Sequence, residues 1–154
     1  MIYGFSMKIS KKCQYALKAL FELAWRNTGK PVKTHSIAAA QRISPRFAEI
    51  ILNDLKRGGF VESRRGKEGG YILARDTRDL TVREVIDYIQ GPISLVPDAT
   101  KAIGDQSCSG NEAFKDLWQE VNDAVSEVCN NKTFAELVEF ERAKRDKCAV
   151  NYSI

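Results

Sequence analysis

The chain has 154 residues and a formal net charge of +4, and this length is enough for one ordinary domain with an extension. The charge is unevenly distributed. Residues 1–75 carry 15 Lys and Arg against 5 Asp and Glu, a net +10, whereas residues 76–154 carry 9 against 15, a net −6. A basic half joined to an acidic half indicates that one end of the protein meets a polyanion and the other has a different task.

The cysteines, at 13, 108, 129 and 148, show no paired spacing of the C-x-x-C kind and do not resemble the disulfide framework of a secreted domain. No apolar run approaches the ~20 residues that span a bilayer, and the extension at 1–9 is too short for a signal peptide. We therefore expect reduced thiols and a cytoplasmic location. Either Met1 or Met7 could be the natural start.

Two helices are expected near the N-terminus. Ser10 is a candidate N-cap for a helix over 11–26, where apolar residues recur at helical spacing. After Gly29 and Pro31, Thr34 is a candidate cap for a short second helix through residues 37–40.

A third helix is expected from Ser44-Pro45 to about Arg57, because serine at the N-cap followed by proline is a strong start signal and glycines follow at 58 and 59. Its spacing predicts a core-facing set of Phe47, Ile50, Ile51 and Leu55. The same spacing leaves an outward set of Arg46, Glu49, Asn53 and Lys56.

Residues 61–75 predict a β-hairpin. The glycines at 66, 69 and 70 permit a sharp turn, and Val61 and residues 71–73 supply β-forming flanks. The tip carries Arg64, Arg65 and Lys67. A ribbon tipped with arginine can follow phosphates or enter a minor groove, although an ordinary solvated hairpin is also open on this stretch alone.

Three helices followed by such a ribbon predict a mainly α fold: a winged helix-turn-helix domain over 10–91 with a two-stranded β wing. This order favours binding of double-stranded DNA, since the first turns of the third helix would meet base edges. The candidate DNA-contacting residues are Thr34, Ser44, Arg46, Phe47, Glu49, Ile50, Arg64, Arg65 and Lys67.

The second half begins with a Thr81-x-x-Glu84 capping box, which predicts a helix ending at Gly91. A loop over 92–110 and a long helix capped by Asn111 follow. Apolar residues in this helix repeat at steps of four, three, four and three, and the set is Phe114, Trp118, Val121, Val125 and Val128.

That repeat is a heptad seam, which predicts a C-terminal dimerisation helix, with an ordinary core helix as the alternative. A second capping box, Thr133-x-x-Glu136, opens a final helix. The dimerisation helices are expected over 111–147 and a tail over 148–154.

The residues also resemble the Rrf2 family of bacterial transcription regulators. The resemblance rests on Tyr15-Ala16-Leu17, Gly58-Gly59-Phe60-Val61, Leu80-Thr81-Val82 and above all Arg65-Gly66-x-x-Gly69-Gly70-Tyr71. The resemblance implies a homodimer with winged helix-turn-helix domains that binds partly palindromic operators. It also implies that Arg65 reaches a minor groove and that Arg46, Glu49 and Ile50 read bases in the major groove.

In several branches of the family, three closely spaced cysteines in the loop before the dimer helix bind an iron-sulfur cluster. Only Cys108 lies in that loop here, so no cofactor is expected; a cluster with atypical ligands is the disfavoured alternative. Cys108 remains a candidate thiol sensor ahead of a helix, and a small-molecule or protein effector is another option.

No enzyme motif is present in the sequence, and the single histidine, His35, is expected to be structural. The predicted function is a homodimeric, DNA-binding transcription regulator, most simply a repressor. The rival from another class is a winged-helix module that binds proteins instead of DNA.

Overall fold

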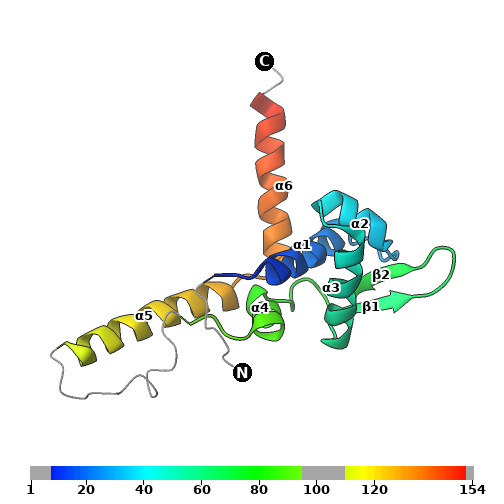
Figure 1. The fold of residues 1–154 in the computed structure, drawn as a ribbon. Coiled ribbons are helices and arrows are strands. Elements are labelled where there is room, and N and C mark those ends of the chain that lie inside the picture. The colour runs from blue at the N-terminus through cyan, green and yellow to red at the C-terminus, as the bar shows by residue number, and fades with distance from the viewer. Residues whose placement is uncertain (1–7, 95–109, 152–154) are drawn as a thin grey trace.

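The computed structural model describes residues 8–94 and 110–151, and it is mainly helical, as expected (Figure 1). The elements are α1 (Lys11–Arg26), α2 (Thr34–Gln41), α3 (Pro45–Arg57), β1 (Val61–Arg64), β2 (Gly70–Leu73), α4 (Val82–Gln90), α5 (Asn111–Asn130) and α6 (Phe134–Asn151). Figure 1 shows α1 to α4 and the ribbon gathered into one body, from which α5 and α6 extend in different directions. No helix in the described ranges is long and apolar enough to cross a membrane.

The core forms around α1, which contributes a fully buried stripe that includes Ala16, Ala19 and Leu20. Helices α2 and α3 close over this stripe, and their buried residues there are Ile37, Ile51, Leu52 and Leu55. Burial of this apolar surface provides most of the stability of such a short-helix domain, since isolated helices of these lengths are marginal in water.

Four of the six expected helix starts are confirmed, and two of these four have serine caps. The Ser10 hydroxyl accepts from the Cys13 amide at 3.1 Å, and the Ser44 hydroxyl accepts from the Phe47 amide at 3.3 Å. Thr34, in contrast, is the first residue inside α2. The N-cap of this helix is Lys33, whose side chain makes no capping hydrogen bond.

The expected cap of α5 was also one residue off. Gly110 occupies the N-cap with φ of 93°, a left-handed conformation that glycine adopts without strain, and Asn111 begins the helix. Helix α6 runs on to Asn151 instead of ending near Lys147. No glycine or proline interrupts residues 144–151, and an Arg145–Glu141 ion pair at 2.9 Å supports this part of the helix.

Both predicted capping boxes are present, and they lie next to each other. Thr81 and Glu84 exchange backbone and side-chain hydrogen bonds at the start of α4, and Thr133 and Glu136 do the same at the start of α6. The two starts are joined by a bridge between Thr81 and Thr133.

The beginning of α6 belongs to the core of the first body. Phe134 is fully buried and Val138 nearly so, and the Phe134 amide donates to the Leu80 carbonyl at 3.0 Å. The region expected to contain only dimerisation helices therefore also completes the winged helix-turn-helix core.

Strands β1 and β2 form an antiparallel pair in which Val61 lies opposite Leu73 and Arg64 opposite Gly70. The base of this ribbon is anchored by a third segment, because Val32 and Tyr71 each donate a backbone hydrogen bond to the other at 2.9 Å. The approach is so close that a Cβ on Gly70 would collide with the Val32 carbonyl oxygen.

We predict that Gly70→Ala destabilises the protein by about 2–3 kcal/mol, because the new methyl group collides with rigid backbone at a positive φ. Gly59→Ala is the matched control: Gly59 also has a positive φ, of 74°, but open space surrounds it. Its expected loss is only about 1 kcal/mol, from backbone strain alone. Equal losses in the free energy of unfolding in urea would show that contact with Val32 does not constrain the ribbon.

Candidate nucleic-acid interface

The turn between α2 and α3 sets the direction of α3. Arg42 takes a left-handed conformation with φ of 53°, and the next residue, Ile43, is buried while its amide donates to the Ala38 carbonyl at 2.9 Å. Ser44 and Pro45 then start α3. A buried apolar residue and one strained backbone position therefore fix the angle at which α3 leaves the body.

The outward face of α3 carries Arg46, Glu49 and Ile50, all of them exposed. The expectation that Ile50 faces the core was wrong: its side chain is 46% exposed. The buried stripe instead consists of Ala48, Ile51, Leu52 and Leu55, which follow the i, i+3, i+4, i+7 spacing of one helix face.

Phe47 and Ser44 are only partly available to a ligand. The Phe47 ring is half-buried and packs edge-on against Tyr15, with ring centroids 5.6 Å apart. The Ser44 hydroxyl is engaged in capping α3. Thr34, at the start of α2, is half-buried as well.

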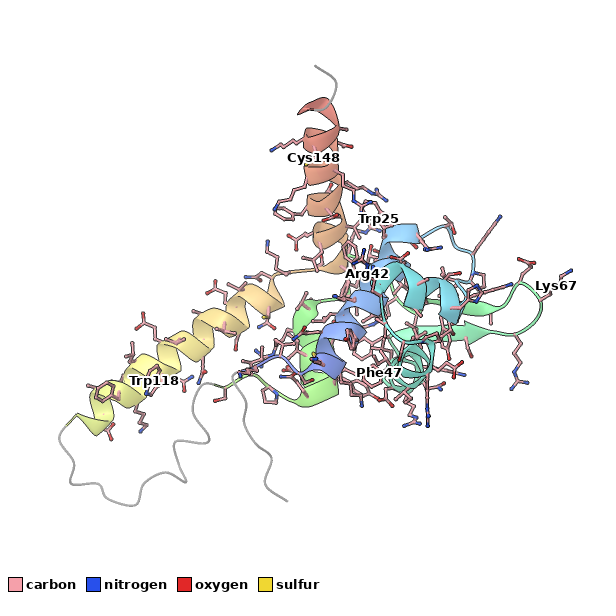
Figure 2. All side chains as sticks on the ribbon, turned by 45° about the horizontal axis from the view of Figure 1, so that its top comes forward. Trp25, Arg42, Phe47, Lys67, Trp118 and Cys148 are labelled. Carbon is pink, nitrogen blue, oxygen red and sulfur yellow. The ribbon has the colours of Figure 1, made fainter. Side chains whose placement is uncertain are left out.

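The tip of the ribbon presents free positive charge. Arg64 pairs with Glu62 at 3.2 Å, whereas Arg65 and Lys67 are exposed and form no ion pair within the described ranges. Figure 2 shows Lys67 at the outer end of the ribbon, away from the body.

Tyr71 connects this ribbon to α3. Its backbone belongs to β2 and is paired with Val32, and its hydroxyl donates to the Asn53 side-chain oxygen at 3.3 Å. The exposed face of α3 and the cationic tip are therefore parts of one braced surface. On it, the side chains free to meet a ligand are Arg46, Glu49, Ile50, Arg65 and Lys67.

Sequence reasoning did not identify Glu22, a residue of α1 whose side chain connects α1 to the end of α2. Glu22 is 6% exposed, and its carboxylate accepts from Arg26 and, at 2.9 Å, from Gln41, the last residue of α2. The signal was available in the sequence: an acidic residue inside the apolar stripe of α1, with an arginine four positions later, is a candidate buried ion pair.

Helix α5 carries the predicted seam on its surface. Phe114 and Val128 are 59% and 62% exposed, Trp118 is exposed, and Val121 and Val125 are half-buried. A row of large apolar side chains left open to water on a single chain is typical of a surface that pairs with a partner.

The cysteines of the described residues do not form a metal site. Cys13 is buried, and burial raises the pKa of its thiol to about 11, which disfavours the thiolate that a metal requires. Cys129 is half-buried on α5 and Cys148 is exposed on α6. No three His, Cys, Asp or Glu side chains in residues 8–94 and 110–151 are grouped to hold a metal ion. Cys108 lies outside the described residues.

A capped, outward-facing α3 beside a cationic two-stranded ribbon defines a winged helix-turn-helix protein of the transcription-regulator class. The chain belongs to the Rrf2 family: the family model described as "Iron-dependent Transcriptional regulator" matches residues 9–140. It is thus a DNA-binding regulator and not an enzyme. In the described ranges, Cys13, Cys129 and Cys148 are not clustered.

Individual relatives agree with this assignment. The chain is 37% identical over 132 residues to an HTH-type transcriptional regulator of Mycobacterium tuberculosis, covering 85% of this chain and 81% of the relative. It is 31% identical over 140 residues to CymR of Bacillus subtilis, covering 91% and 96%. The solved structure of that CymR, described as the global cysteine regulator of its organism, superposes with a TM-score of 0.75 over 86% of this chain and 97% of CymR.

Proposed function

We propose that this protein is a homodimeric repressor that binds partly palindromic operator DNA in the bacterial cytoplasm. In each protomer, Arg46, Glu49 and Ile50 read base edges in a major groove and Arg65 enters the neighbouring minor groove. The observation that carries this proposal is the unpaired, exposed state of Arg65 and Lys67 on a ribbon that Tyr71 braces against α3.

The α5 seam supplies the two-fold axis. A reader of two half-sites needs a symmetric partner, and the apolar side chains of Phe114, Trp118 and Val128 become buried if two copies of α5 pair. Since α5 points away from the ribbon in Figure 1, pairing through it leaves both DNA-reading surfaces open.

The signal is proposed to be a thiol or metabolite signal instead of an iron-sulfur cluster. Cys13 is buried with a raised pKa, and the sequence supplies only Cys108 in the loop expected to hold ligands. CymR, which this chain resembles over most of its length, is described as a cysteine regulator, and this supports a link to thiol metabolism.

Arg65→Ala should weaken binding to operators with AT-rich flanks by about 1–3 kcal/mol, because the arginine side chain is placed for a narrow minor groove. Lys144→Ala, on the exposed part of α6, is the charge-matched control and should change binding little. Affinities are measured by fluorescence anisotropy on duplexes that the protein selects from a random-sequence pool. Equal losses for the two variants would exclude the proposed role of Arg65, and salt-independent binding of the wild type would favour the protein-interaction alternative.

Replacing both Trp118 and Val128 by alanine should weaken the dimer by about 2 kcal/mol or more, roughly 30-fold in the dissociation constant, because exposed aromatic residues often dominate such interfaces. Both side chains are exposed in the single chain, so the fold of the protomer should survive. Glu120→Ala, an exposed change elsewhere on α5, is the control. Sedimentation equilibrium over a dilution series measures the constants, and an unchanged dimer would place the interface elsewhere.

The purified protein should show no visible absorbance beyond that of protein, and Cys108→Ser should bind operator like the wild type under reducing conditions. A single loop cysteine supplies too few thiolates for a cluster. Anaerobic purification followed by a visible spectrum is the measurement. A brown protein whose colour is lost in Cys108→Ser would establish an atypical cluster.

A further inference from the structure

A cavity of about 490 Å³ opens on the surface where the end of α1 meets the start of α2. Its lining is rich in cations and hydroxyls: Arg26, Lys30, Lys33, Thr28 and Ser36 contribute to it, together with the Trp25 ring. No Asp or Glu side chain lines it. The composition points to an anionic ligand.

Two of the three cations are free to bind that ligand. Arg26 is paired with the buried Glu22, but the Lys30 and Lys33 side chains are exposed and make no ion pair within the described part of the chain. A lysine ammonium is a compact charge on a flexible stem with three rotatable donors, so it binds a phosphate oxygen as a point charge.

The aromatic wall of the cavity is already occupied, which disfavours a planar aromatic ligand. Trp25 stacks on Phe21 with ring centroids 6.1 Å apart, and the guanidinium carbons of Arg142 and Arg145 lie 5.4 and 4.7 Å from its ring centre. Figure 2 shows Trp25 beside the base of α6. The groups left to recognise a ligand are ammonium and hydroxyl donors.

The cavity is fixed to the ribbon. Val32, which lines the cavity, forms the two backbone hydrogen bonds to Tyr71, and the Gly70 backbone packs against Val32 and Lys33. The backbone at Val32 and Lys33 is therefore held beside the wing that carries Arg65, and Lys30 lies two residues before Val32. A DNA duplex bound to the wing would bring its phosphate backbone close to these two lysines.

We propose that this cavity binds a phosphate of the DNA backbone beside the base of the wing, through Lys30 and Lys33. The proposal rests on the proposed operator binding and extends the DNA contact beyond α3 and the ribbon tip. The contact is independent of base sequence, since phosphates carry no sequence information. It positions the protein on the duplex and adds to the salt dependence of binding.

The test compares the full chain with Lys30→Gln/Lys33→Gln, with Lys144→Gln/Lys147→Gln as a control of equal charge change on the exposed end of α6. Binding to a duplex selected from a random-sequence pool and to an unrelated duplex is measured across a range of salt concentrations. We expect the slope of log K against log salt to become less steep by about 0.9, the value for one phosphate contact, only when Lys30 and Lys33 are changed. The affinity loss should be the same on both duplexes, and Lys30→Arg/Lys33→Arg should restore the slope.

A second measurement locates the phosphate. Neutral methylphosphonates, introduced one at a time along the selected duplex, should include a position that weakens wild-type binding and has no further effect on Lys30→Gln/Lys33→Gln. An unchanged salt slope, a loss confined to the selected duplex, or no such position would overturn the proposal. A wild type that shows no salt-dependent binding to any duplex would instead refute the proposed function itself.

The alternative ligand for this cavity is a free anion such as inorganic phosphate. Inorganic phosphate is added at constant ionic strength while tryptophan fluorescence is recorded. A change seen in the wild type and absent from Lys30→Gln/Lys33→Gln, together with an unchanged salt slope, would assign the cavity to a free anion and overturn the DNA contact. No phosphate response, with the expected loss of slope, supports the proposal.

Discussion

The paired hydrogen bonds between Val32 and Tyr71 are the constraint on which the DNA-reading surface depends. A two-stranded ribbon is marginally stable by itself, and here a third backbone segment closes its base. The Tyr71 hydroxyl then reaches Asn53 of α3, so a single residue contacts the ribbon, the α1–α2 connection and α3. Without this bracing, the angle between α3 and the ribbon tip would vary, and ordering both elements on DNA would lower the affinity.

Local rules were sufficient to predict much of this architecture. Ser10, Ser44 and the two Thr-x-x-Glu boxes form the expected caps because a helix start is decided by residues within one turn. The ribbon was likewise predictable, since its glycines and β-forming flanks are adjacent in the sequence. The errors at Thr34 and Asn111 are one-residue shifts, which the same local chemistry tolerates.

The remaining features depend on contacts between distant segments, and no local pattern shows them. Val32 has no strand neighbours in sequence, and its pairing appears only when Tyr71 is brought beside it. Ile50 was assigned to the core because it is apolar, yet Leu52 and Ala48 complete the buried stripe and leave Ile50 outside. A single exposed isoleucine is common on protein surfaces, so apolar character alone does not assign a residue to the core.

The joint between α5 and α6 connects α5 to the body that carries the ribbon. The Val82 amide donates to the Lys132 carbonyl, Thr81 bridges Thr133, and Phe134 is buried under the same body that carries the ribbon. If two copies pair through α5, this joint fixes how far apart the two wings lie. Because half-sites on one face of a duplex are spaced by about 34 Å, a small change in the direction of α5 at this joint would move both wings out of register. If two copies pair in this way, a change in the direction of α5 needs no contact with α3 or the wing to alter the spacing of the two wings.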